Sequence, residues 1–190
     1  MTLSWGQILR LLSGGFHLSK LYQQNHQRAR LEACPMSATK ISYATKGWSP
    51  VHGCGDERAG AGCAHCYARR LAETRLRGQG SYPAKDPFRV VLDWMKLDEP
   101  LHWRTPQRVM LAPMGDIFHD QVPDSYLRNV FGAIEQTSQH TYLVFTKRVE
   151  RAAEFSHWWV SGFPRNAWLI ASASTQAEVD RIAPVLLQIP

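Results

Sequence analysis

Short apolar runs alternate with amphipathic stretches over the second half of the chain. The runs at 108–113, 141–146 and 167–172 are typical of buried strands. Between the first two runs, apolar residues recur at positions i, i+3, i+4 and i+7, the spacing of one helix face. These residues are Leu127, Val130, Phe131 and Ile134. The pattern therefore predicts strands that alternate with helices.

Residues that flank the amphipathic stretches predict where the helices begin and end. Asp124 or Ser125 can cap the first helix. A second helix is predicted over 149–159. A third begins near Thr175, and Pro184 is expected to kink or end it.

The order of these elements predicts the fold class. Three consecutive strand–helix units favour a parallel sheet covered by helices, and hence an α/β fold. Upstream, 88–94 is a further expected strand, 41–48 is a weaker one, and 67–78 is an expected helix closed by Gly78. No closing strand follows the last helix. We therefore expect a partial (βα) barrel that is truncated at the C-terminus.

Composition and charge exclude several classes of protein. The chain has 190 residues, 44% of them hydrophobic and 20% charged, which fits one domain and excludes a disordered or disulfide-dense protein. It has no run of 18 apolar residues, so no membrane partner is expected. The formal net charge is +6, but residues 1–35 carry four basic residues and one acidic residue. Half of the excess lies there, so basicity alone is weak evidence for a nucleic-acid partner.

The first 35 residues differ in composition from the rest of the chain. They are rich in Gln, His and Arg around 22–30, and Met36 opens a different stretch. We therefore expect 1–35 to be an N-terminal extension outside the fold, and 36–190 to form the domain with Met36 as its natural start. The alternative is an amphipathic N-terminal helix that packs on the domain.

Three clustered cysteines are the sharpest chemical feature. Cys54, Cys63 and Cys66 follow the 41–48 segment at the spacing Cys-x8-Cys-x2-Cys, in a glycine-rich loop before the 67–78 helix. In barrels this end of the strands is the ligand end. No secretory signal precedes the cysteines, so a cytoplasmic location and a bound metal or cluster are expected. Three thiolates would leave one iron of a [4Fe–4S] cluster open to a cofactor such as S-adenosylmethionine.

Zinc is the competing ligand for these thiols. A Cys3His site needs one further ligand, which His52, His119 or Cys34 could supply. His65 lies inside the Cys-x2-Cys turn and would have difficulty reaching the same ion. Three buried free thiols are the remaining alternative.

Polar residues also follow two of the predicted strands. Asp116 and His119 follow the first one and could bind a substrate or transfer a proton; the alternative is a helix cap with a surface histidine. Lys147 and Arg148 follow the second and could bind a carboxylate or a phosphate of a substrate; the alternative is a solvated helix start.

Blocks of sequence around the cysteines and further along the chain carry a family resemblance. The chain resembles the phage-associated three-Cys-motif family, a domain of unknown function catalogued after phage gene products thirty-seven and sixty-eight. The resemblance covers about residues 40–190. The blocks that carry it include 46–54, 62–71, 114–119 and 146–148.

The resemblance implies a radical-SAM-like partial (βα) barrel in which Cys54, Cys63 and Cys66 ligate a [4Fe–4S] cluster. It implies S-adenosylmethionine on the open iron, and a partner protein of the same family encoded by a neighbouring gene. We expect an enzyme if the cluster and the missing C-terminal part are present, acting on a nucleic-acid or nucleotide substrate. The alternatives are a zinc-binding, non-catalytic module associated with nucleic acid, and an inactive fragment of the enzyme.

Overall fold

The fold is mixed α/β, built around a four-stranded parallel sheet. The structure is a computed structural model that describes residues 41–55, 59–157 and 163–189. The expected N-terminal extension, 1–35, lies outside the described residues, as does Cys34. In the described part of the chain, no helix is both long and apolar enough to cross a membrane.

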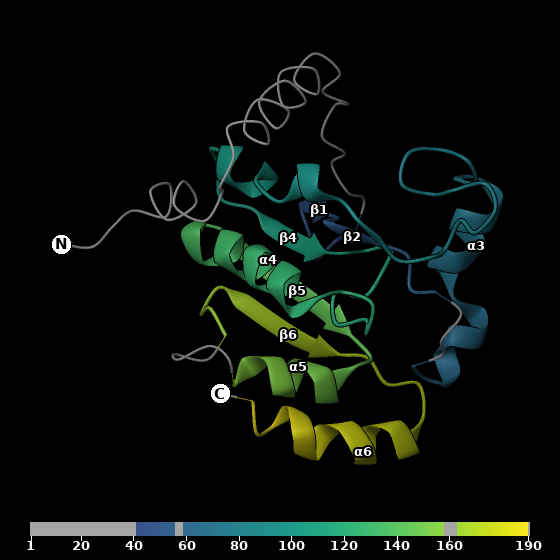
Figure 1. Ribbon diagram of the computed structural model, residues 1–190. Coiled ribbons are helices and arrows are strands. Elements are labelled where there is room, and N and C mark those ends of the chain that lie inside the picture. The colour runs from purple at the N-terminus through teal and green to yellow at the C-terminus, as the bar shows by residue number, and fades with distance from the viewer. Residues whose placement is uncertain (1–40, 56–58, 158–162, 190) are drawn as a thin grey trace. The chain divides into compact units, whose positions relative to one another are not determined.

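Four strands form the parallel sheet in the order β1-β4-β5-β6. Each strand pairs with the next one, so that Lys46 lies beside Val109, Val109 beside Tyr142, and Tyr142 beside Ala167. Figure 1 shows β4 and β6 running in the same direction, and β5 pairs in parallel with both. The strands are β1 (Lys46–Trp48), β4 (Arg108–Leu111), β5 (Thr141–Thr146) and β6 (Ala167–Ala171).

Helices follow the last three strands of the sheet. They are α4 (Asp124–Gln136), α5 (Val149–Ser156) and α6 (Gln176–Leu186). Alternate residues of β4 and β5, among them Val109, Leu111 and Val144, share one core with Phe131 of α4 and Phe155 of α5. The three predicted strand–helix units and the parallel sheet are therefore confirmed. A closed barrel is not formed by the described residues.

The opposite face of the sheet is less covered. Met110, Leu143 and Trp168 are neighbours across β4, β5 and β6, and Trp168 is 61% exposed. On the same face, the Phe145 ring packs against Tyr43 with 5.9 Å between ring centroids. The two faces therefore differ: helices bury one, and the other remains partly open beside the cysteine loop.

The segment between β1 and β4 contains short elements. Strands β2 (Val51–His52) and β3 (Val91–Leu92) pair in an antiparallel two-stranded sheet, and α3 (Tyr67–Thr74) follows the cysteines. Three short 3₁₀ helices complete the segment: η1 (Ala61–His65), η2 (Trp94–Lys96) and η3 (Glu99–His102).

Several predicted boundaries differ from those of the structure. The expected strand 88–94 is only two residues long, because the Asp93 side chain accepts a hydrogen bond from the backbone of Met95 and starts η2. The expected 67–78 helix ends at Thr74. Pro123, not Asp124 or Ser125, occupies the N-cap position of α4. Pro184 lies inside α6, which continues to Leu186.

Candidate functional site

The cysteine loop begins after β2, where Gly53 forms a parallel bridge with Gly115 beyond the carboxyl end of β4. The backbone N–H groups of Cys54 and Gly55 both donate to the carbonyl of Phe88, over 3.0 and 2.9 Å. The N–H of Gly53 donates to the carbonyl of Met114, in the loop that follows β4. Cys54 is thus held between two backbone segments, as expected for the ligand end of an α/β fold.

Gly53 is required by this close approach. Its φ of 73° lies in the left-handed region, and a Cβ built on it would lie 2.0 Å from the carbonyl oxygen of Arg89. Because any other side chain would collide with backbone atoms, only glycine allows the chain to enter the loop at this point.

Cys63 and Cys66 lie on the other side of the loop, at the junction of η1 and α3. Cys63 is part of η1, and Cys66 is the N-cap residue of α3. The Cys66 sulfur accepts the backbone N–H of Arg69 over 3.5 Å. This hydrogen bond holds the Cys66 side chain at the N-terminus of α3.

The turn before α6 fastens the middle of the cysteine loop. The Glu178 carboxylate accepts hydrogen bonds from the backbone of Ala61 over 2.6 Å and of Ser174 over 2.5 Å. A Cβ on Gly60 would lie 2.7 Å from Glu178 Oε1, and one on Gly62 would lie 2.3 Å from Ser174 Oγ. The two glycines therefore allow the last strand–helix unit to pack directly on this loop.

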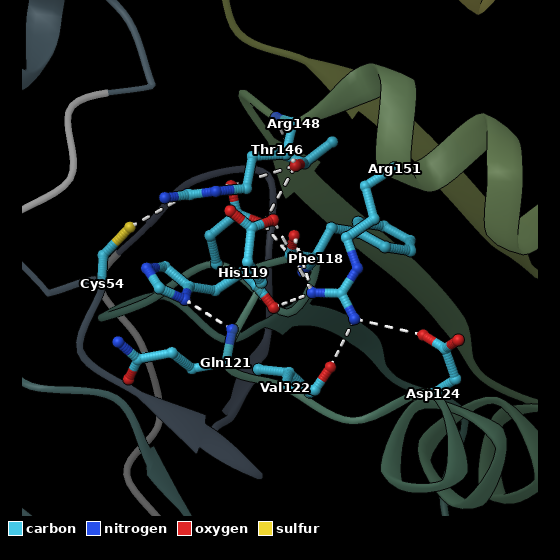
Figure 2. A network of polar contacts seen from close by, with 11 residues as sticks. Cys54, Phe118, His119, Gln121, Val122, Asp124, Thr146, Arg148 and Arg151 are labelled. Atoms are coloured by element: carbon cyan, nitrogen blue, oxygen red, sulfur yellow. Dashed lines mark hydrogen bonds and ion pairs between the residues drawn. The ribbon is translucent and has the colours of Figure 1, made fainter.

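Arg148 links Cys54 to the loop after β4. Its guanidinium donates to the Cys54 sulfur over 3.3 Å (Figure 2). It also lies 3.5 Å from the Asp116 carboxylate. Burial raises the pKa of the Cys54 thiol, whereas the charge and hydrogen bond of Arg148 act in the opposite direction. In the described structure this arginine is directed at a cysteine, not at open solvent.

Asp116 is buried and accepts several hydrogen bonds. The Thr146 hydroxyl donates to both carboxylate oxygens, over 2.9 and 3.0 Å, and the backbone N–H groups of Phe118 and Lys147 also donate. The carboxylate therefore joins the carboxyl ends of β4 and β5. With this many donors it is suited to hold the loops of the site in position.

His119 is fully buried beside the cysteine loop. A Cβ on Gly55 would lie 3.6 Å from its Nε2 atom. Its Nδ1 atom accepts the backbone N–H of Gln121 over 3.1 Å. The alternative of a surface histidine is therefore wrong, and His119 lies near Cys54 and Arg148 (Figure 2).

The side chain of Lys147 lies against the glycines of the cysteine loop. Its Nζ atom lies 3.9 Å from a Cβ built on Gly62. Lys147 lines the cysteine cavity and also a neighbouring polar pocket of about 560 Å³, whose other lining residues include Arg151, Glu178 and Arg181. Lys147 is therefore placed where an anionic group of a ligand could contact it.

All three cysteines line one cavity of about 400 Å³. Its floor includes Met110 and Phe145, from the less covered face of the sheet. Among the residues that the structure describes, no three His, Cys, Asp or Glu side chains are grouped closely enough to hold a single metal ion. The thiols surround a cavity instead of converging on one point.

His52, the other expected zinc ligand among the described residues, faces different partners. His52 Nδ1 lies 3.2 Å from the Tyr82 hydroxyl, and its Nε2 lies 3.8 Å from the Asp93 carboxylate. His65 lines the cysteine cavity but is exposed. Of the expected site residues, the structure thus brings together the three cysteines, Asp116, His119, Lys147 and Arg148.

Sequence reasoning missed three contributions to the site. The Arg69 guanidinium donates to the carbonyl of Gly55, and the Tyr67 hydroxyl donates to the carbonyl of Pro113 over 2.5 Å. The third is the contact of Glu178 with the cysteine loop. The sequence Thr175-x-x-Glu178 identifies a capping box. The contact of Glu178 with Ala61 depends on tertiary structure and leaves no local signal.

The fold and the site together define a class of protein: an α/β protein that gathers three thiols in one cavity at the carboxyl edge of a parallel sheet. The model of a family described as a protein of unknown function (DUF5131) matches residues 38–190, and the chain belongs to this family. No curated protein and no solved structure matches the chain.

Proposed function

We propose that this chain is a radical-SAM-like iron–sulfur protein of the phage three-Cys type, with a partial (βα) barrel. Cys54, Cys63 and Cys66 would ligate a [4Fe–4S] cluster whose open iron binds S-adenosylmethionine. The observation that carries the proposal is the lining of one cavity by all three thiols. Three thiolates are a suitable donor set for a cluster with one open iron, and the cavity is larger than a single ion needs.

The residues around the cavity suit this chemistry. When bound, the cluster would supply the electron for reductive cleavage of S-adenosylmethionine. Arg148 provides positive charge next to Cys54, which stabilises thiolate. Met110 and Phe145 provide apolar surface that would exclude water from the reacting groups.

The substrate proposed for this site is a nucleic acid or a nucleotide. Lys147 lies between the cysteine cavity and the polar pocket, where its ammonium could contact a phosphate. The Tyr43 and Tyr67 rings line the cysteine cavity and are 47% and 52% exposed. Aromatic rings of this kind can stack on bases.

The cluster can be tested by anaerobic purification and reconstitution with iron and sulfide. We expect a brown protein with broad visible absorption and about four irons per chain. Cys63→Ala should abolish the absorption, whereas Cys34→Ala, outside the three-cysteine pattern, should keep it. A colourless protein that retains stoichiometric zinc after reconstitution would overturn the proposal.

The enzymatic part of the proposal needs a separate assay. Reduced, cluster-loaded protein should release 5′-deoxyadenosine from S-adenosylmethionine, and an oligonucleotide or nucleotide substrate should increase the rate. A Lys147→Ala variant should bind the nucleotide more weakly while it retains the cluster. A loaded protein that releases no 5′-deoxyadenosine with any of these would contradict the enzymatic role.

A further inference from the structure

His119 is positioned so that its ring faces the loop that carries the first cysteine. It is 0% exposed, and its Nε2 atom lies 3.6 Å from a Cβ built on Gly55, the residue after Cys54. Figure 2 shows the ring between Gln121 on one side and Cys54 on the other. One ring nitrogen is therefore used within its own loop, and the other is directed at the cysteine loop.

The hydrogen bond to Gln121 determines which nitrogen carries the proton. The Gln121 backbone N–H donates to Nδ1 over 3.1 Å, so Nδ1 must present its lone pair. The neutral ring then carries its proton on Nε2, which makes that atom a donor. A histidine that binds a metal through Nε2 needs the opposite arrangement, with a proton on Nδ1. His119 is therefore suited to donate a hydrogen bond toward the cysteine loop and unsuited to ligate zinc.

The backbone that carries His119 is braced by α5. The Arg151 guanidinium donates to the carbonyls of His119 and Val122 and lies 3.1 Å from the Asp124 carboxylate (Figure 2). The Val122 N–H also donates to the His119 carbonyl, over 2.8 Å. Because the loop is fixed in this way, the ring loses little conformational entropy when it makes a further hydrogen bond.

We propose that His119 is a positioning residue that donates its Nε2 hydrogen bond to a sulfur at the Cys54 corner of the cluster. The inference rests on the proposed function. Reduction adds negative charge to the sulfurs, so a donor stabilises the reduced state more than the oxidised state. His119 thereby raises the reduction potential of the cluster and eases electron uptake.

The test is a redox titration of reconstituted variants, followed by electron paramagnetic resonance. His119→Leu should take up wild-type amounts of iron and sulfide but have a more negative midpoint potential. His119→Gln, which keeps an N–H donor, should shift the potential less. The matched control is His140→Gln: His140 is also buried and accepts a backbone N–H at Nδ1, from Gln107, but its ring packs against Trp103 and Tyr142 instead of the cysteine loop. Its potential should equal that of the wild type.

A fully loaded His119→Leu protein with the wild-type potential would overturn the inference and leave the cluster assignment intact. Absence of a cluster from the wild type would overturn both.

A second measurement keeps His119 and replaces the exposed His65, the other histidine beside the cysteines. His65→Gln protein labelled with ¹⁵N only at histidine should show one weakly coupled ¹⁵N nucleus in the pulsed electron paramagnetic resonance spectrum of the reduced cluster. Absence of that coupling in a loaded sample would overturn the inference.

Discussion

The Arg148 guanidinium donates a hydrogen bond to the Cys54 sulfur over 3.3 Å, although the two residues are 94 positions apart. The arginine side chain is only 10% exposed, and it also lies 3.5 Å from Asp116. One cation thus connects the first cysteine with the end of β4 from its own position after β5. Arg148 therefore both holds two loops of the site together and places a positive charge beside Cys54.

Substitution Arg148→Met should lower the free energy of unfolding by about 2 to 3 kcal/mol, because it removes a buried charge-assisted hydrogen bond and a partner of Asp116. Urea denaturation of the metal-free protein measures this loss. The matched control is Arg181→Met, since Arg181 pairs with Glu150 where both side chains are 47% exposed. That variant should lose less than about 1 kcal/mol. Equal losses in the two variants would contradict the role of Arg148.

Substitution Asp116→Asn should lower the free energy of unfolding by about 1 to 3 kcal/mol. The carboxylate accepts hydrogen bonds from Thr146, Phe118 and Lys147. In asparagine an NH₂ group replaces one of the two acceptor oxygens, so at least one of these donors would face another donor. Thermal and urea denaturation measure the effect. Asp120→Asn, at a side chain that is 69% exposed, should change stability by less than about 0.5 kcal/mol. An Asp116→Asn protein of wild-type stability would show that the loops do not need this carboxylate.

Two glycine substitutions should have opposite effects. Gly53→Ala places a methyl group against the Arg89 carbonyl in a left-handed conformation, so it should destabilise the protein by more than about 3 kcal/mol. Gly132→Ala, in α4, meets no atom within 4 Å and should stabilise the helix by up to about 1 kcal/mol. Melting temperatures of the two variants provide the comparison. A Gly53→Ala protein with the melting temperature of the wild type would show that the backbone at Gly53 can shift away from the Arg89 carbonyl.

Stability should fall as the pH is lowered through the mildly acidic range, in part because of His52. Burial lowers the pKa of this side chain below its ordinary value of 6.5, against the opposing effect of Asp93. Below pH 6.5 the unfolded chain therefore binds a proton that the folded protein does not, and protonation favours unfolding. Above that value the effect is absent.

The measurement for His52 is urea denaturation at several pH values between neutral and mildly acidic. The wild type should lose stability toward acid more steeply than His52→Gln, which cannot titrate. Parallel curves for the two proteins would mean that His52 keeps its ordinary pKa in the folded state.

The sequence predicted the main sheet well because its strands are continuous apolar runs. The predicted strand 141–146 coincides with β5, and the residues of α4 that were expected to face the core are all buried. The local pattern of apolar and polar residues is sufficient to predict such elements, because a buried strand is a continuous apolar run and an amphipathic helix repeats every three to four residues. Val91–Leu92 shows the limit: its partner is the two-residue strand Val51–His52, and pairing of this length leaves little periodicity to detect.

The site was predicted only as far as strand ends can be located in a sequence. Asp116 and Arg148 follow neighbouring strands of the parallel sheet, and Cys54 follows β1 after the two-residue strand β2, so their proximity could be expected. The contact between Arg148 and Cys54, and the direction of the His119 ring, depend on side-chain packing across loops. Glu178 is the clearest case, because the same carboxylate completes a local capping box and contacts Ala61, 117 positions away.

This double use of Glu178 has a consequence for biosynthesis. Ribosomes make the three cysteines long before they make residues 174–178, which hold the cysteine loop through Ala61 and Gly62. During translation the three cysteines are therefore present in a nascent chain whose cysteine loop does not yet have its contacts with Ser174 and Glu178. The cysteine loop therefore reaches its final conformation only when the last strand–helix unit has emerged and folded onto it.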